Sequence, residues 1–460
     1  MIRIFNHYLH RDTLRQALAD LGFLVVALLA ALSTQFEYLN NWLPIASTQV
    51  LSLTAGVFVI GTASGVYQKS GNVTLVQTCA RATLALMLAL PLTYVIFGLL
   101  PAEPQTRLTV QISAMVGVAA VLMRRIYVTH SGAVTGERTR VLIFGTGKAA
   151  KIVGDTLEDS DPLAQIVGYV PGPNESEPAV PLKMILNGDR PLTQIAHEHG
   201  VDEIIVALTE RRAGSMPLRQ LLDCKLFGIK VYDLATHFEK RLGLIRVEFV
   251  NAGWLVFGDG FNQGALRSAV KRLFDVVFAL LLIVLSAPVM IIAALLIKLD
   301  SRGPLVYRQE RVGINGSTFM VAKFRSMRTD AEQDGKPRWA SLQDDRVTRV
   351  GAIIRRLRID ELPQLFNVLR GDMSLVGPRP ERPFFVDQLT QQIPYFAVRH
   401  SVKPGVTGWA QVRYQYGATV EDAQQKLQYD LYYVKNHSLF LDAIILLETV
   451  GVVLTGKGAR

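Results

Sequence analysis

The chain has 460 residues, half of them hydrophobic and 19% charged. That composition excludes an ordinary soluble single-domain protein and makes a membrane protein of more than one domain the first expectation. The net charge of +10 leaves nucleic acid, anionic lipid and phosphorylated compounds as partners, and two cysteines exclude a disulfide framework and a thiolate metal site.

Four apolar stretches begin the chain, and each has about the length needed to cross ~30 Å of hydrocarbon. Lysine and arginine gather before the first stretch, in the loop after the second and directly after the fourth. Because basic residues are retained on the cytoplasmic side, we expect four transmembrane helices with the N-terminus and everything after Arg125 in the cytoplasm. The four stretches are residues 17–36, 43–67, 82–100 and 108–123.

Short β-branched runs alternate with amphipathic segments from about residue 138 to residue 262. This alternation predicts a doubly wound, Rossmann-like α/β domain. Its predicted strands are residues 140–144, 165–170, 203–207 and 229–232.

The first of these strands is followed by Gly145-Thr-Gly147-Lys-Ala-Ala150, which matches a dinucleotide phosphate turn. The second strand ends in Tyr169-Val-Pro-Gly172, without the carboxylate that holds a ribose hydroxyl. Bound NAD is therefore not expected. A glycine-tight turn in a scaffold that binds nothing, or only senses a nucleotide, fits the sequence better.

A fifth apolar stretch covers residues 276–297, with Pro288 near its middle and basic residues on both flanks. Two forms are open. Length favours an ordinary crossing, whereas the proline and the two basic flanks favour a re-entrant helix, at about residues 268–298, that enters and leaves by one face. The charged region from residue 300 to the C-terminus should lie at the membrane surface, and residues 439–454 indicate an interfacial helix.

Five arginines fall between residues 346 and 358, just before the adjacent carboxylates Asp360 and Glu361. The carboxylates should open a helix that Gly371 ends, with Asp360 near its N-cap. An aspartate there is ordinarily only a cap. However, a helix N-terminus and five arginines also suit a diphosphate, and two adjacent carboxylates suit a cation bound with it.

Arg379 lies between two prolines in Gly377-Pro-Arg-Pro380, and Arg382 follows closely. The prolines fix the backbone around Arg379, so that the guanidinium is presented at a reduced entropic cost. A phosphate clamp and a rigid surface turn both remain open for this segment.

Seven motifs from about Ser268 to the C-terminus together resemble the bacterial sugar transferase family, the polyprenyl-phosphate hexose-1-phosphate transferases. The four N-terminal stretches and the α/β domain are similar to the large monotopic members of that family. The motifs are Lys271-Arg-Leu-Phe-Asp275, the apolar stretch with Pro288, Gly303-Pro304, Lys323-Phe-Arg325-Ser-Met, Asp360-Glu-Leu-Pro-Gln364, Gly377-Pro-Arg-Pro380 and Lys403-Pro-Gly-Val-Thr-Gly-Trp409.

The resemblance implies that Asp360 is a nucleophile that attacks the β-phosphate of a UDP-sugar, releases UMP and keeps the sugar phosphate until a polyprenyl phosphate takes it. Glu361 would manage protons or, with Asp360, hold Mg²⁺ or Mn²⁺. Pro288 would break the re-entrant helix. Phosphate oxygens would be bound by Arg355 and Arg379, joined by Lys323, Arg325 and Arg382.

We therefore predict three domains: four membrane helices in residues 1–130, the α/β domain in residues 131–264, and the transferase domain in residues 265–460. The expected setting is the cytoplasmic face of a bacterial inner membrane, in the first step of exopolysaccharide, capsule or O-antigen synthesis. The expected partners are a UDP-sugar, a polyprenyl phosphate and the bilayer, with no nucleic acid; large family members make a homodimer reasonable. Nothing in the sequence identifies the sugar.

Two alternatives remain. One is an inactive membrane scaffold or regulator of polysaccharide assembly, against which the intact Asp360-Glu361 pair speaks. The other is a nucleotide-sugar dehydratase, which needs a Tyr-x-x-x-Lys pair that this sequence lacks.

Overall fold

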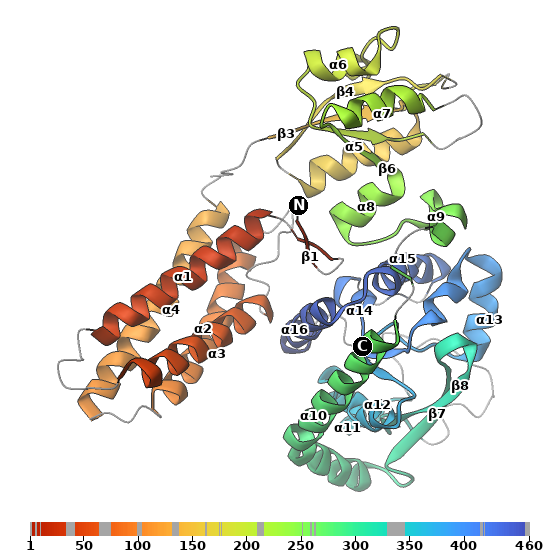
Figure 1. Cartoon of the computed structure of the whole chain (residues 1–460). Coiled ribbons are helices and arrows are strands. Elements are labelled where there is room, and N and C mark those ends of the chain that lie inside the picture. Colours follow the sequence, from red (N-terminus) through yellow and green to blue (C-terminus); the bar gives the residue numbers. More distant parts are fainter. Residues whose placement is uncertain are drawn as a thin grey trace. The chain divides into compact units, whose positions relative to one another are not determined.

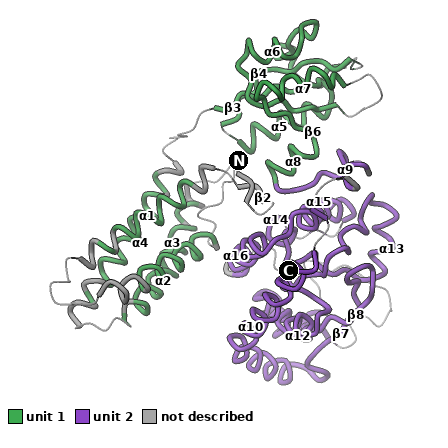
Figure 2. Tube along the Cα trace, in the orientation of Figure 1, with its two compact units in different colours: residues 1–2, 8–242 green, residues 3–7, 243–460 purple. Residues whose placement is uncertain are grey.

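The contacts of the chain divide it into two compact units, residues 1–2 with 8–242 and residues 3–7 with 243–460 (Figure 2). The predicted division into three domains stays a prediction; the contacts assign residues 243–264 to the second unit. The structure, a computed structural model, describes residues 2–4, 7–9, 11–33, 42–63, 75–98, 104–130, 138–161, 163–173, 175, 177–208, 216–250, 252–257, 260–261, 264–328, 346–414, 417 and 419–455.

Two short strands, β1 (Ile2–Ile4) and β2 (His7–Leu9), precede four helices that lie where the four apolar stretches were predicted. The helices pack side by side (Figure 1) around small and branched residues such as Leu53, Ala89 and Val118. Buried Asp20 forms an ion pair with Arg124 across this bundle. The helices are α1 (Arg11–Ser33), α2 (Trp42–Ala63), α3 (Leu75–Gly98) and α4 (Pro104–His130).

Only one helix among the described residues, α10 (Ala265–Asp300), is long and apolar enough by length and composition to cross a membrane. The described parts of α2, α3 and α4 contain shorter apolar runs. Helix formation in the N-terminal stretches is therefore confirmed, whereas four crossings stay a prediction.

The α/β domain has a parallel sheet with the strand order β4-β3-β5-β6, which confirms the predicted parallel α/β architecture. Helices α6 and α7 share a core with Leu142 and Ile204 on one face, and α5 and α8 contact each other on the other face. The sheet is thus doubly wound. Its elements are β3 (Thr139–Phe144), α5 (Lys148–Ser160), β4 (Ala164–Val170), η2 (Leu182–Met184), α6 (Leu192–Glu198), β5 (Glu203–Val206), α7 (Leu218–Leu226), β6 (Lys230–Asp233) and α8 (Leu234–Leu242).

The glycine turn before α5 is occupied by a carboxylate of the same domain. Gly145 has φ +132°, and a Cβ there would lie 3.0 Å from the Ala207 carbonyl oxygen, so glycine is required. The backbone N–H groups of Thr146, Gly147 and Gly172 donate to the Glu175 carboxylate at 2.6, 3.1 and 3.1 Å. Glu175 thus takes the donors that a pyrophosphate would use.

The second unit begins with η3 (Val247–Phe249), α9 (Ala252–Phe257) and α10, and continues with a β-hairpin and short helices. A parallel pair of three-residue strands, β9 and β10, lies within it. Its further elements are β7 (Val306–Val312), η4 (Ile314–Gly316), β8 (Thr318–Phe324), α11 (Arg349–Arg356), η5 (Ile359–Glu361), α12 (Gln364–Arg370), β9 (Ser374–Val376), α13 (Pro383–Gln392), η6 (Phe396–Ser401), β10 (Gly405–Thr407), α14 (Trp409–Arg413), α15 (Val420–Asn436) and α16 (Leu439–Thr455).

Helix α10 is one helix of 36 residues that continues through Pro288, where a break was expected. If straight, it would be about 54 Å long. Yet both ends contact the same unit: Arg272 donates to the carbonyls of Val368 and Leu369, while Ile297 packs against Ile354. The helix changes direction along its length (Figure 1).

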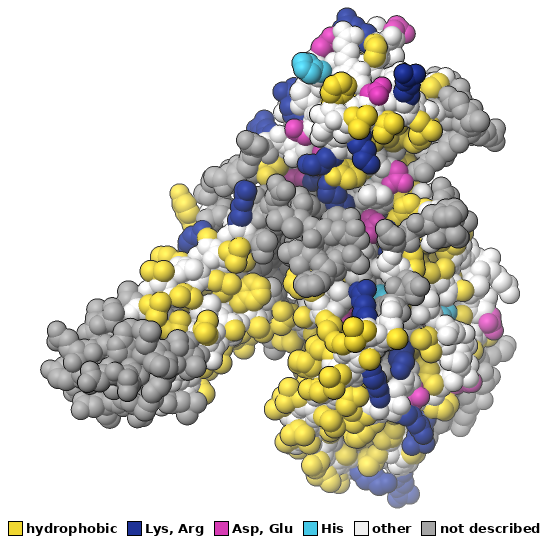
Figure 3. All heavy atoms as spheres, in the orientation of Figure 1, with side chains coloured by type: hydrophobic (Ala, Val, Ile, Leu, Met, Phe, Trp, Pro, Cys, Tyr) yellow, Lys and Arg dark blue, Asp and Glu magenta, His cyan; other side chains and the backbone are white. Residues whose placement is uncertain are grey.

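The middle of α10 exposes a continuous apolar surface, which appears as the yellow patch over this helix in Figure 3. Val284, Leu285 and Ile291 are 70%, 66% and 61% exposed. In α16, by contrast, the carboxylates Asp442 and Glu448 are buried and ion-paired with Lys271 and Arg413, so they are not the solvent-facing side of an interfacial helix.

Candidate active site

Asp360 and Glu361 lie in a 3₁₀ turn, η5, between two short helices. Thr348 caps α11 by accepting a hydrogen bond from the Gly351 N–H. After α11 the chain turns at Arg358, which is left-handed with φ 58°. The N-cap of the following helix, α12, is Pro363, so the two carboxylates lie in the turn before that helix and do not open it as expected, while Gly371 ends it as predicted.

Glu361 is surrounded by cations. Its Oε1 accepts from Lys323 Nζ at 3.1 Å and from Arg379 Nη2 at 2.8 Å, and its Oε2 lies 3.9 Å from Arg358 Nη1. Although burial opposes ionisation, Arg379 and Lys323 hold the pKa of the Glu361 carboxyl well below its usual range. Glu361 is therefore ionised and fixed in place.

Asp360 differs from its neighbour although it is also buried. Among the described residues, no hydrogen bond or ion pair reaches its carboxylate. Burial and the adjacent Glu361 charge raise the pKa of Asp360 to about 6, against the opposing effect of Lys323, Arg379 and Arg355. Glu361 is thus held by two cations at Oε1, whereas Asp360 has no such contact among the described residues.

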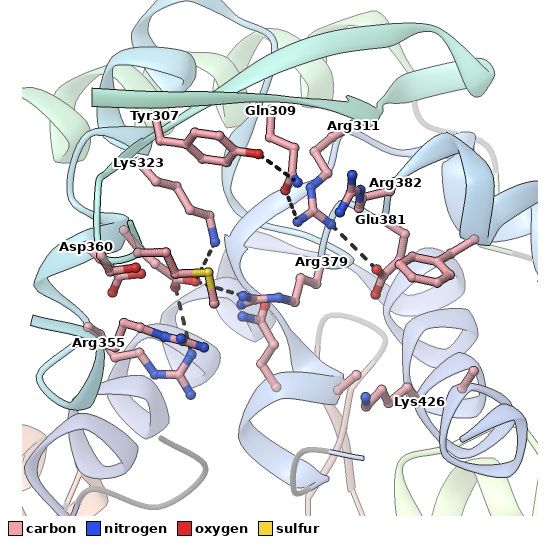
Figure 4. Close-up of a pocket in the computed structure, with 18 of the residues that line it drawn as sticks. Tyr307, Gln309, Arg311, Lys323, Arg355, Asp360, Arg379, Glu381, Arg382 and Lys426 are labelled. Atoms are coloured by element: carbon pink, nitrogen blue, oxygen red, sulfur yellow. Dashed lines mark hydrogen bonds and ion pairs between the residues drawn. The ribbon is translucent and has the colours of Figure 1, made fainter. Parts of the chain in front are cut away.

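Both carboxylates line a cavity of about 640 Å³, together with all five phosphate-binding residues predicted from the sequence. Lys323 comes from β8, Arg355 from α11 and Arg379 from the loop after β9. Figure 4 shows these three side chains converging near Asp360. Burial lowers the pKa of Lys323, whereas Glu361 opposes that shift. A cation-rich cavity of this kind suits a diphosphate.

Arg325 lines the cavity but uses its guanidinium elsewhere. Its terminal nitrogens donate to the Arg302 carbonyl at 3.0 Å and to the Ser301 carbonyl at 2.7 Å. These bonds tie β8 to the end of α10. The geometry thus gives Arg325 a structural role, and the phosphate contact expected of it stays a prediction.

Several cavity residues were missed by the sequence analysis. The alternation of side chains along β7 places Tyr307, Gln309 and Arg311 on one face of the strand, and this period-two pattern could have indicated them. Arg311 donates to the Pro380 carbonyl at 3.1 Å. No local pattern marks Arg399 and Asp430, which reach the cavity from η6 and α15.

The residues present could hold a divalent cation only in company with an anionic substrate. In the described part of the chain, no group of three or more His, Cys, Asp or Glu side chains could hold a metal ion. Mg²⁺, however, is commonly bound by one or two carboxylates plus substrate phosphates. Asp360 and Glu361 supply those oxygens, while the surrounding arginines and Lys323 would repel a bare cation.

Comparison with known proteins places this site in a family. The family model described as bacterial sugar transferase matches residues 266–456. A UDP-N-acetylgalactosamine-undecaprenyl-phosphate N-acetylgalactosaminephosphotransferase of Aeromonas hydrophila is 45% identical over 242 residues, which cover 53% of this chain and 56% of that protein.

For two further relatives, the match covers a larger share of the relative's own length. A UDP-glucose:undecaprenyl-phosphate glucose-1-phosphate transferase of Caulobacter vibrioides is 49% identical over 41% of this chain and 71% of its own length. A protein of Bacillus subtilis named as a putative undecaprenyl-phosphate N-acetylgalactosaminyl 1-phosphate transferase is 53% identical over 28% of this chain and 73% of its own. The chain belongs to the bacterial sugar transferase family.

Proposed function

We propose that this protein transfers a hexose-1-phosphate from a UDP-sugar to undecaprenyl phosphate and releases UMP. The names of the relatives support the reaction class. The observation that carries the proposal is a contrast within one cation-lined cavity. Glu361 accepts hydrogen bonds from two cations, whereas no hydrogen bond or ion pair among the described residues reaches the Asp360 carboxylate.

In the first step, an Asp360 oxygen attacks the β-phosphorus of the UDP-sugar. The bond between that phosphorus and the oxygen bridging to UMP breaks, and UMP leaves with the electron pair. An aspartyl phosphosugar remains. Arg379, Lys323 and Arg355 offset the charge on the phosphate oxygens, and ionised Glu361 orients Arg379 and Lys323 for that task.

In the second step, a phosphate oxygen of undecaprenyl phosphate attacks the same phosphorus. The Asp360 carboxylate leaves, and the product is a lipid diphosphate sugar. Splitting one displacement into two avoids bringing two anionic substrates together in a single transition state. Ionised Asp360 is the reactive form in step one and is regenerated in step two.

Asp360 and Glu361 would also hold Mg²⁺ when it enters with the diphosphate. When bound, the ion would offset the negative charge that develops on departing UMP. Removal of divalent cations with a chelator is therefore expected to abolish UMP release, and Mg²⁺ to restore it.

The apolar surface of α10 supports a position at the membrane. We propose that α10 enters and leaves the cytoplasmic leaflet with its bend near Pro288, and that α1 to α4 cross the bilayer. The chain would then act on the cytoplasmic face of a bacterial inner membrane and begin the synthesis of an exopolysaccharide, capsule or O-antigen.

The test uses the full chain in membranes with a panel of UDP-sugars, with UMP release and lipid-linked sugar phosphate as the readouts. We expect turnover with at least one UDP-hexose or UDP-N-acetylhexosamine. Asp360→Asn should lose turnover by orders of magnitude and should not retain a radiolabelled sugar phosphate on the protein. Near-normal turnover in Asp360→Asn would mean that the nucleophile is assigned wrongly.

A further inference from the structure

The loop that presents Arg379 is held at its backbone from several sides. This loop, residues 376–380, follows β9, and four of its carbonyl groups accept hydrogen bonds from other elements. The donors are Tyr433 Oη to the Val376 oxygen at 2.9 Å, Gly405 N to Pro378 at 3.0 Å, Arg399 Nη2 to Arg379 at 2.9 Å and Arg311 Nη1 to Pro380 at 3.1 Å.

Arg399 is itself held by Asp430. Its Nη2 lies 2.8 Å from Asp430 Oδ2, and the Arg399 guanidinium lies over the Phe396 ring at 5.1 Å. The two residues are 5% and 1% exposed. One nitrogen of Arg399 therefore joins a buried carboxylate to the backbone carbonyl of Arg379.

This buried pair is poorly arranged as a purely stabilising contact. Asp430 Oδ1 and Arg399 Nε are buried without a hydrogen-bond partner in the described part of the protein. Burial raises the pKa of Asp430 to about 6 even with Arg399 beside it. Buried charges without a full set of hydrogen bonds usually contribute little net stability. The presence of this pair therefore calls for an explanation other than stability.

Arg379 connects the pair to the proposed catalytic centre. The Arg379 carbonyl accepts from Arg399, and the Arg379 guanidinium donates to Glu361 at 2.8 Å. Tyr433, three residues after Asp430 on α15, donates to the Val376 carbonyl at the start of the loop. One face of α15 thus fixes the backbone on both sides of Arg379.

We propose that Asp430 and Arg399 are positioning residues, which set where the Arg379 guanidinium meets the transferred phosphate. This inference rests on the proposed function and adds a requirement to it. Asp430 would affect transfer only through Arg379. A contact that merely stabilises the fold would affect turnover whether or not Arg379 is present.

A double-mutant cycle on the full chain in membranes tests the proposal. Turnover number and KM for UMP release would be measured for Asp430→Asn, Arg379→Ala and the double variant. Asp430→Asn keeps the side-chain shape but removes the charge that orients Arg399, and a misplaced phosphate clamp is expected to lower kcat on the order of 100-fold, with a smaller change in KM. Adding Asp430→Asn to Arg379→Ala should then cause no further loss.

Glu448→Gln is the matched control, because it breaks another part-buried ion pair of the same unit, to Arg413 at 2.6 Å. Its effect, whatever the size, should be the same factor with and without Arg379. If Asp430→Asn also lowers kcat by the same factor in both backgrounds, the positioning role is wrong.

Two other results would be equally decisive. If Asp430→Asn does not accumulate as folded protein, Arg399→Lys replaces it in the cycle, since lysine keeps the positive charge but not the planar pair of donors; additive effects would again overturn the inference. If Arg379→Ala alone keeps normal turnover, the phosphate role proposed for Arg379 fails, and the positioning role fails with it.

Discussion

Asp360 and Glu361 are neighbours in one 3₁₀ turn with opposite surroundings, and this contrast determines their chemistry. Glu361 accepts from two cations and stays ionised well below neutral pH. Asp360 has no such partner, and burial raises its pKa to about 6. A carboxylate with a raised pKa is a better nucleophile once ionised, because it is less stabilised by its surroundings.

The pKa of Asp360 predicts the acid limit of activity. Because the reactive form is the carboxylate, kcat/KM for UMP release should be constant above about pH 7 and fall at least tenfold per unit below about pH 6. Lys323 lowers the pKa of Asp360. Lys323→Met should therefore move the acid limb to higher pH, as measured in a pH–rate profile.

Lys435→Met provides the control for this profile. Lys435 lies over the Trp254 ring at 4.0 Å and does not line the cavity, so its loss should leave the acid limb in place. An acid limb in Lys323→Met that stays where it is, or moves to lower pH, would contradict the assignment of the limb to Asp360.

The sequence predicted which residues form the site better than it predicted their contacts. The resemblance to the sugar transferase family implied Asp360, Glu361, Lys323, Arg355, Arg379 and Arg382, and all line one cavity. The phosphate contact expected of Arg325 stays a prediction, and sequence alone does not show that the carbonyls of Ser301 and Arg302 lie beside its guanidinium. Arg399 and Asp430 were missed because only the folded chain brings η6 and α15 to the Arg379 loop.

Elements defined by periodicity were predicted well. The four strands of the α/β sheet lie within about one residue of their predicted bounds, because a short β-branched run between turn residues is a specific signal for a buried strand. Helix α12 was less predictable. Its apolar residue Phe366 is 54% exposed, whereas the buried face contains the polar Asn367, whose amide forms hydrogen bonds with the backbone of Met320 and Ala322 in β8.

The glycine turn before α5 has the backbone conformation of a phosphate-binding turn, but its N–H groups bind a side chain of the same domain. The turn has the backbone expected of a dinucleotide site, but the Glu175 carboxylate accepts from its N–H groups and from the Thr146 hydroxyl at 3.0 Å. Glycine is required at residue 145 because the Ala207 carbonyl lies too close for a side chain. The motif does not require NAD.

Glu175→Ala should loosen this turn. Loss of a charged acceptor that serves three backbone donors is expected to cost about 2 kcal/mol locally. Amide hydrogen exchange of Thr146 and Gly147 in the intact chain should then speed up more than tenfold. Glu177→Ala, an exposed carboxylate of the same loop, is the control and should leave both amides unchanged. Unchanged exchange in Glu175→Ala would show that the carboxylate does not hold the turn.

At the scale of the whole molecule, the direction of α10 decides which side of the membrane carries the transferase unit. An ordinary crossing would place residues before and after α10 on opposite sides, whereas a re-entrant helix keeps them together. The contacts of both ends with one unit favour the second form. The cytoplasmic location of nucleotide sugars requires it for the proposed reaction.

Paired cysteine labelling distinguishes the two forms without assuming the orientation of the N-terminal helices. Leu226→Cys, before α10, and Leu299→Cys, at the C-terminal end of α10, are at positions 77% and 84% exposed and would be made separately in a chain with Cys79→Ala and Cys224→Ser. A membrane-impermeant maleimide should label neither in intact cells and both in inverted membrane vesicles, because the re-entrant form proposed for α10 places both positions in the cytoplasm. Labelling of Leu299→Cys alone from the outside would show that α10 crosses the bilayer, and the cavity around Asp360 would then be cut off from its nucleotide substrate.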